Sequence, residues 1–169
     1  MKIFAILLTV GESENVQEVK ATDETRWCLL LTDPSTGEER KVWVEPDEEH
    51  ETESGRSSSN FVMKWKDSHR ECTVDIREVG QGWSLEEEDG PLVTFECKNA
   101  EIKACYLTDK TTFDIVFESG GSVEGEEFSD GDWCGFDEDA DGQASLLGLA
   151  TKAVEVKIKG GKARRRKKK

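Results

Sequence analysis

Residues 27–44 read WCLLLTDPSTGEERKVWV, and this stretch decides the fold class. Trp27–Thr32 is an apolar run of strand length, and Asp33-Pro34-Ser35-Thr36-Gly37 follows it. In that turn Asp stands at the first position, Pro restricts φ, and Gly is free to take a positive φ. The chain returns through Lys41–Val44, which again suits a strand. The stretch therefore predicts a β-hairpin.

Further runs of strand length lie on both sides of this hairpin. They are either continuously apolar or alternate apolar with polar residues at period two, as strands with one or two buried faces do. The predicted strands cover residues 3–10, 61–66, 72–79, 92–97, 102–107, 112–118 and 153–158. No amphipathic pattern of three helical turns is recognisable. The sequence therefore predicts an all-β or mainly β chain built of antiparallel sheets.

Two acidic stretches separate the predicted strands. Residues 45–60 read EPDEEHETESGRSSSN and carry almost no apolar side chain, which predicts a long mobile loop. Residues 119–142 form a second acidic stretch that is rich in Gly and Ser. We expect residues 1–158 to form a single β-rich domain and residues 159–169 to form a disordered basic tail.

Charge is unevenly distributed along the chain. The net charge is −14, but residues 157–169 hold nine Lys or Arg and no acid, which leaves 14 basic and 37 acidic residues, or about −23, elsewhere. Such a body repels nucleic acid and anionic lipid. We therefore expect no membrane partner, and nucleic acid only through the tail. The candidate contact residues of the tail are Lys162, Arg164, Arg165, Arg166, Lys167, Lys168 and Lys169.

The tail has three interpretations that the sequence leaves open. It is an import signal, an electrostatic contact to nucleic acid or to an acidic protein surface, or an inert solubilising segment that folds back on the acidic body. Screening at physiological salt is compatible with each of them.

The residue types that catalysis needs are sparse. The chain has two histidines, His50 and His69, and His50 lies inside the acidic stretch. The sequence therefore offers few residues from which a nucleophile, a base and an orienting group could be assembled. Gly55-Arg56-Ser57-Ser58-Ser59 lacks the Gly-Lys-Ser/Thr ending of a phosphate-binding loop. We expect no enzyme and assign no catalytic residue.

The metal-ligating residue types form no complete site in the sequence. Five cysteines in an odd, scattered set, none spaced as CxxC, favour reduced thiols in an intracellular protein. Residues 137–142 read DEDADG, as an EF-hand loop begins, but its twelfth position is Gly148. His69 and Cys72 form one H-x-x-C pair, which Cys28 could join in space. That set remains an alternative, and we expect no metal or cofactor.

Several ordered marks along the chain resemble a known family. They are Arg26-Trp27 before the first hairpin and Trp43 at its end, Gly55-Arg56 before Phe61-Val62, Phe95-Glu96-Cys97-Lys98 with Glu101, Phe128-Ser129-Asp130, and Asp132-Trp133-x-x-Phe136-Asp137-Glu138. Over roughly residues 1–158, these marks resemble the eukaryotic CXXC-motif-containing zinc-binding protein family, whose function is poorly defined. The resemblance implies two β-rich halves, roughly 1–79 and 91–158, related by approximate internal symmetry.

The chain departs from this family at its defining feature. Family members carry two CxxC pairs, one at each of two hairpin turns, and the pairs bind one zinc. In register with the shared marks, these positions fall on Asp33, Thr36, Trp65 and Ser68, and none is cysteine. The resemblance therefore implies a divergent member without the family's zinc ligands. We expect residues 33–37 to form a self-sufficient turn, and Trp65 to pack where metal and thiolates would sit.

The leading interpretation of function is a non-catalytic protein-interaction or scaffold module whose partner is a protein. We expect a monomer in the cytoplasm, with the nucleus as the alternative that the tail leaves open. One rival function is the binding of nucleic acid or of an acidic surface through the Lys/Arg tail. Another is metal handling through a ligand set that is not the family's.

Overall fold

The computed structural model describes residues 1–80, 82–87 and 90–157. In these ranges the secondary structure consists of strands β1 to β17 and contains no helix, and every strand pairing is antiparallel. The predicted all-β class and antiparallel pairing are therefore confirmed. None of the described residues forms a helix of the length and apolarity needed to span a bilayer.

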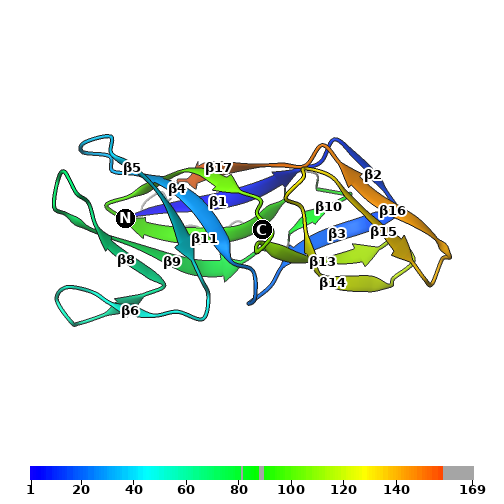
Figure 1. Ribbon diagram of the computed structural model, residues 1–169, viewed down its shortest axis with the longest axis horizontal. Coiled ribbons are helices and arrows are strands. Elements are labelled where there is room, and N and C mark those ends of the chain that lie inside the picture. Colours follow the sequence, from blue (N-terminus) through cyan, green and yellow to red (C-terminus); the bar gives the residue numbers. More distant parts are fainter. Residues whose placement is uncertain (81, 88–89, 158–169) are drawn as a thin grey trace.

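A five-stranded sheet runs through the left half of the molecule, and a three-stranded sheet lies over it (Figure 1). The five-stranded sheet has the order β17 (Ala150–Val156), β1 (Lys2–Thr9), β11 (Pro91–Lys98), β9 (Glu71–Val79), β8 (Phe61–Lys64). The three-stranded sheet has the order β12 (Glu101–Tyr106), β4 (Trp27–Thr32), β5 (Glu39–Val44). The predicted hairpin is the β4–β5 pair, in which Trp27 faces Val44.

Smaller sheets build the right half of the molecule (Figure 1). The first has the order β10 (Trp83–Ser84), β3 (Val16–Ala21), β13 (Thr112–Phe117), β14 (Ser122–Glu127). The second has the order β15 (Trp133–Asp137), β16 (Gly142–Leu147), β2 (Glu12–Glu14). A short hairpin, β6 (His50–Glu51) with β7 (Ser58–Ser59), lies at the left end.

The two acidic stretches contain more regular structure than their composition indicates. Residues 45–60 hold the β6–β7 hairpin, and the mobility expected of this loop stays a prediction. Residues 119–142 hold β14 and β15. Phe128 and Trp133 of this segment are buried, and most of its acidic residues face water. Asp137 is an acidic residue that is buried.

The sheets do not divide the chain between residues 80 and 90. The five-stranded sheet takes β1, β8 and β9 from residues 1–79, and β11 and β17 from residues 91–158. Each of the two predicted halves therefore completes a sheet of the other. The approximate symmetry that the resemblance implied stays a prediction.

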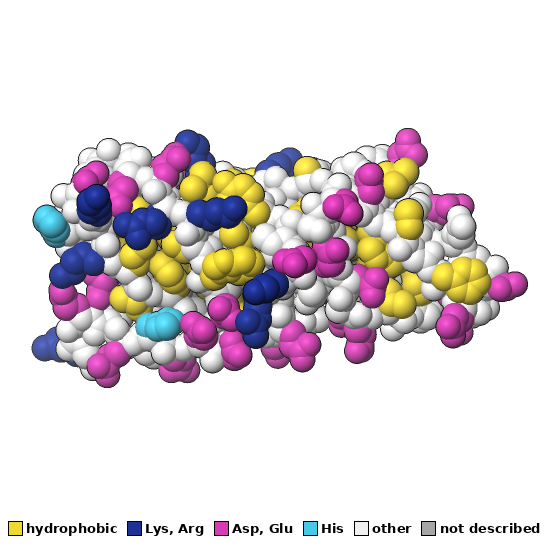
Figure 2. Space-filling view, viewed as in Figure 1, with side chains coloured by type: hydrophobic (Ala, Val, Ile, Leu, Met, Phe, Trp, Pro, Cys, Tyr) yellow, Lys and Arg dark blue, Asp and Glu magenta, His cyan; other side chains and the backbone are white. Residues whose placement is uncertain are grey.

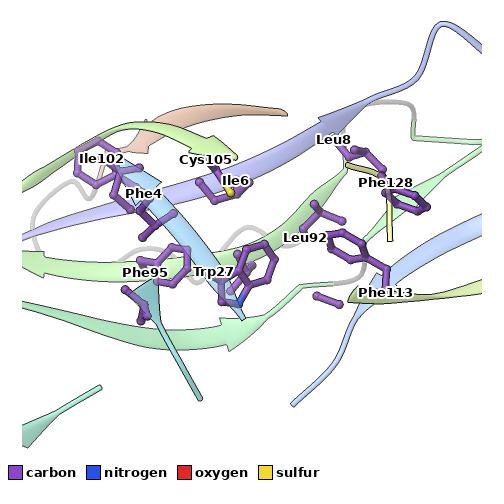
Figure 3. Packing of buried hydrophobic residues seen from close by; sticks show 14 of the residues in the cluster. Phe4, Ile6, Leu8, Trp27, Leu92, Phe95, Ile102, Cys105, Phe113 and Phe128 are labelled. Atoms are coloured by element: carbon purple, nitrogen blue, oxygen red, sulfur yellow. The ribbon is translucent and has the colours of Figure 1, made fainter. Parts of the chain in front are cut away.

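A continuous apolar core joins the two ends of the molecule, and Trp27 lies at its middle (Figure 3). The Trp27 ring meets Phe95 edge-on, with centroids 5.8 Å apart, and Phe113 on the other side, with centroids 6.0 Å apart. Phe113 in turn stacks on Phe128 at 5.1 Å. Large aromatic side chains bury the most area per residue, so this series lets a chain with a modest apolar content close one core.

Candidate functional site

The two hairpin turns assigned to the family's ligand positions meet at the left end of the molecule (Figure 1). The Ser68 hydroxyl of the β8–β9 turn donates to Asp33 Oδ2 of the β4–β5 turn at 2.7 Å. The Glu38 carboxylate accepts from the backbone amides of Lys66 at 3.4 Å and Asp67 at 3.0 Å. We call these five residues the turn junction. It brings together Asp33 and Ser68, which are 35 residues apart in the sequence.

The β4–β5 turn is closed by its own residues, which supports the expectation that it is self-sufficient. The Gly37 amide donates to the Asp33 carbonyl at 2.8 Å, and Gly37 has φ 84°, a conformation that glycine adopts without strain. The Ser35 amide and hydroxyl both donate to Asp33 Oδ1, at 2.9 and 2.8 Å. Such bonding by a first-position Asp is the usual chemistry of this kind of turn.

Asp33 is an ionised carboxylate in a fully enclosed place. Its side chain has 0% exposure, and burial on its own would raise the pKa. Hydrogen bonds from Ser35, Ser68 and Thr36 outweigh burial and hold the pKa of Asp33 below its ordinary value. The Arg70 guanidinium, 3.7 Å from Oδ1, adds an opposite charge at the solvent side. The charged form of this carboxylate is therefore favoured, and the group accepts hydrogen bonds from Ser35 and Ser68 while closed to solvent.

Trp65 is fully buried beside the turn junction. Its Nε1 donates to the Asn99 carbonyl at 2.8 Å, and the Asn99 side chain donates to the Glu71 carbonyl at 2.8 Å. The sequence did not mark Asn99 as a partner. The residue type gives only a modest indication of a turn at this position: Asn is one of the few residues that tolerate a positive φ, and Asn99 has φ 58°.

Thr36 lies at the rim of the site and not inside it. The residue is exposed, and its hydroxyl accepts from the Glu38 amide at 3.2 Å. Of the four family positions, the structure therefore buries Trp65 and joins Asp33 to Ser68, while Thr36 faces water.

The residues at these four positions do not fit zinc. Structural zinc is held by four thiolate, imidazole or carboxylate donors in a tetrahedron. Here the donor set is one carboxylate and two hydroxyls, because the indole of Trp65 has no free lone pair and its N–H is already donated to Asn99. The Asp33 oxygens are themselves engaged by Ser35 and Ser68.

The alternative ligands Cys28, His69 and Cys72 are not gathered into a site. Cys28 and Cys72 are buried in β4 and β9, while His69 is exposed at the tip of a turn. Over the described ranges, no three His, Cys, Asp or Glu side chains are placed to hold a metal ion. Burial raises the pKa of Cys28, and burial together with Asp33 raises the pKa of Cys72 to about 12. In the metal-free chain, burial therefore disfavours the thiolate form at both positions.

The opposite end of the molecule carries a similar arrangement. Asp137, at the β15–β16 turn, is also buried, and its Oδ2 accepts from the Ser119 hydroxyl at 2.6 Å and the Asn15 amide at 2.9 Å. Its Oδ1 accepts from the backbone amides of Asp139 and Ala140. Hydrogen bonds from Ser119 and Asn15 lower the pKa of Asp137. At each end, one buried aspartate thus joins two hairpin turns through a serine hydroxyl.

The predicted contact residues of the tail lie outside the described residues. They are Lys162, Arg164, Arg165, Arg166, Lys167, Lys168 and Lys169, and the described chain ends at Lys157. Their assignment stays a prediction.

Comparison with known proteins bears on the family and the fold. A UPF0587 protein from Nematostella vectensis is 29% identical over 157 residues, which cover 85% of this chain and 92% of the relative. The crystal structure of C1orf123 matches with a TM-score of 0.80 at 22% identity. The matched region covers 91% of this chain and 99% of the C1orf123 chain. A hypothetical protein from Plasmodium falciparum has a TM-score of 0.80 at 19% identity, over 91% and 100% of the two chains. At these identities the two structures show a shared fold.

The family itself is shown by a sequence model. The model for the CXXC motif containing zinc binding protein, eukaryotic, matches residues 6–153, which is most of the chain. The match includes all the residues of the turn junction, and Trp27 with Phe95, Phe113 and Phe128 of the core. The chain therefore belongs to the eukaryotic family of CXXC motif-containing zinc-binding proteins.

Proposed function

We propose that this chain is a non-catalytic protein-interaction or scaffold module in which the turn junction takes the place of the family's zinc site. The observation that carries the proposal is the 2.7 Å hydrogen bond from Ser68 to Asp33, with Trp65 buried beside it. These contacts hold the two turns together with protein atoms alone. A zinc ion in that place would have to displace hydrogen bonds that already satisfy the carboxylate.

The chemistry of the described side chains supports a role without catalysis. The pKa values of Cys72, Cys97 and Cys105 are raised to about 12, with burial as the leading cause, so these thiols are not nucleophiles at neutral pH. His50 is paired with Glu48 at 3.0 Å. Within the described residues, no hydrogen bond joins a His ring to a Ser or Cys side chain, which is one common way to activate a nucleophile.

Elemental analysis tests the loss of zinc. Protein purified without a histidine tag should hold less than about 0.1 zinc per chain, and a chelator should leave its melting temperature unchanged, because structural zinc contributes directly to folding free energy. About one zinc per chain with chelator-sensitive melting would contradict the proposal. Cys28, His69 and Cys72 would then be the first residues to replace.

A fourfold variant provides the matched control. Asp33→Cys, Thr36→Cys, Trp65→Cys and Ser68→Cys together recreate two CxxC pairs at the two turns. Because the turns already meet, we expect this variant to take up about one zinc per chain in tetrahedral thiolate coordination. Cobalt substitution reports that coordination by its absorption spectrum. A variant that folds but takes up no metal would show that the ligand positions are wrongly assigned.

A further inference from the structure

The sheets of the left half leave a groove between two unpaired edges. Strand β5 pairs with β4 on one side, and β8 pairs with β9 on one side, so each is an edge strand of its described sheet. A groove of about 520 Å³ lies between them, bounded by Arg40, Lys41 and Trp43 of β5 and by Phe61, Val62 and Met63 of β8. We call it the edge groove. Open edges offer backbone donors and acceptors to another strand.

The turn junction lies at one end of the edge groove. Glu38 immediately precedes β5, Lys66 follows closely on β8, and the Glu38 carboxylate accepts from the Lys66 and Asp67 amides. The two strands are therefore joined at the end where the family would hold zinc. Trp43 and Phe61 stand toward the other ends of the two strands.

Trp43 makes the edge groove unlike an ordinary charged sheet edge. Trp27, Trp65, Trp83 and Trp133 are at most 6% exposed, whereas Trp43 is 41% exposed. A single exposed apolar residue needs no explanation. Here, however, the exposed indole shares one groove with the half-buried Phe61, Val62 and Met63. Trp is among the residues that are enriched in binding hot spots.

The charges of the edge groove favour an acidic occupant. Of its two carboxylates, Glu45 is offset by the Arg26 guanidinium at 2.9 Å, and Glu48 shares a hydrogen bond with the His50 ring at 3.0 Å. Lys41, by contrast, is exposed, and its ammonium lies 4.5 Å from the centroid of the Tyr106 ring. A carboxylate can approach that ammonium without displacing an acid.

The wider surface strengthens this preference. Figure 2 shows hydrophobic side chains gathered over β4 and β5 at the left, with Lys and Arg side chains among them and acidic side chains around them, while acidic side chains outnumber basic ones in the right half. An acidic segment is repelled by most of this protein and is attracted where the cations and the apolar side chains coincide.

We propose that the edge groove binds an extended, acidic segment of a partner protein, which adds a strand along β5 and places an apolar side chain against Trp43 and a carboxylate near Lys41. Main-chain hydrogen bonds to the open edge would supply affinity, and the indole and ammonium would supply selectivity. The inference rests on the proposed interaction function and names the surface and the partner chemistry that serve it.

Panning a phage library of random peptides, of the length of β5, against the full chain tests the proposal. We expect enrichment of sequences that combine Asp or Glu with an aromatic or branched apolar residue. A selected peptide, made synthetically, should reduce acrylamide quenching of tryptophan fluorescence, because Trp43 is the exposed tryptophan. It should also slow hydrogen exchange of amides in residues 39–44.

Matched variants locate the binding. Trp43→Ala should weaken the selected peptide at least about tenfold, as loss of a hot-spot residue does. Lys41→Glu should weaken it several-fold at low salt, with the difference fading at high salt. Two controls should leave affinity unchanged. Phe136→Ala removes an aromatic side chain of 51% exposure at the far end, and Lys20→Glu reverses an exposed lysine of β3.

The outcomes separate this inference from the proposed function. Enrichment with equal affinity for Trp43→Ala and Phe136→Ala would overturn the edge groove and leave the interaction module standing. Enrichment of basic peptides would overturn the acidic partner chemistry. If no peptide is enriched on the intact chain, both proposals fail. A concentration-dependent dimer in sedimentation that Trp43→Ala abolishes would make a second copy the occupant, and would also overturn the proposal.

Discussion

At the scale of single residues, Trp65 is a buried side chain, unable to bind metal, at a position assigned to one of the family's ligands. It is fully buried, and its indole N–H is satisfied by the Asn99 carbonyl. Trp65→Ala should lower the free energy of unfolding by about 3–5 kcal/mol, the usual cost of truncating a buried Trp. Urea unfolding measures it, with Trp43→Ala as the exposed control. An unchanged midpoint for Trp65→Ala would mean that the side chain does not support this end.

Asp33 contributes to the free energy of unfolding in a pH-dependent way, and the sign of this contribution follows from its lowered pKa. An unfolded Asp titrates near about 3.9. The contribution is therefore complete above that pH and is lost as the pH falls through the lower pKa of the folded chain. Asp33→Asn should be less stable by about 1.5–3 kcal/mol at neutral pH, the value of a hydrogen bond to a charged group. Its stability should also fall less between about pH 5 and about pH 2.

Urea midpoints across that pH range test the Asp33 prediction. Asp137→Asn is the matched variant, because the pKa of Asp137 is lowered in the same direction by Ser119 and Asn15. The double variant, Asp33→Asn with Asp137→Asn, should lose the least stability as the pH falls. Parallel acid limbs for the native chain and Asp33→Asn would show that Asp33 titrates alike in the folded and unfolded chains.

At the scale of strands and turns, the two serines make comparable cross-links. Ser68 joins the β8–β9 turn to Asp33, and Ser119 joins the β13–β14 turn to Asp137. Ser68→Ala should therefore speed hydrogen exchange at the left end, at the Lys66 and Asp67 amides that Glu38 holds, with little effect around β15. Ser119→Ala should do the reverse. Exchange measured residue by residue by NMR decides the matter, and uniform acceleration in both variants would indicate a general loss of stability instead.

Sequence patterns predicted the strands whose own side chains are buried on one or both faces of the sheet. The apolar run at residues 3–10 became β1, and Trp27–Thr32 became β4 with its boundaries unchanged. They missed several strands, among them β3, which reads VQEVKA, and the acidic β14. β14 reads SVEGEE, and its pairing with β13 comes from the hairpin and from burial of the adjacent Phe128, which a local window does not include.

At the scale of the whole molecule, the candidate site was only partly predictable, because it is made by contacts between distant segments. The positions of Asp33 and Ser68 came from the family resemblance, and no pattern in the letters would have joined them. Asn99, 34 residues after Trp65, and Glu38, 28 residues before Lys66, were missed. Asn99 offers only the tolerance of Asn for a positive φ, and Glu38 is one glutamate among many; only the packed sheets bring them to the turns.

The division of charge between body and tail leads to the last prediction. A body near −23 should repel a polyanion, so any affinity for single-stranded nucleic acid must come from the nine cations of residues 157–169. Filter binding should show affinity that falls steeply with salt, with a logarithmic slope of about 0.7 for each phosphate neutralised. Deleting residues 160–169 should abolish it, and Arg164→Ala, Arg165→Ala and Arg166→Ala together should reduce the slope by about two units. If the shortened chain keeps both the affinity and the slope, the polyanion is held by the folded body. The cations around the edge groove would then be the first place to look.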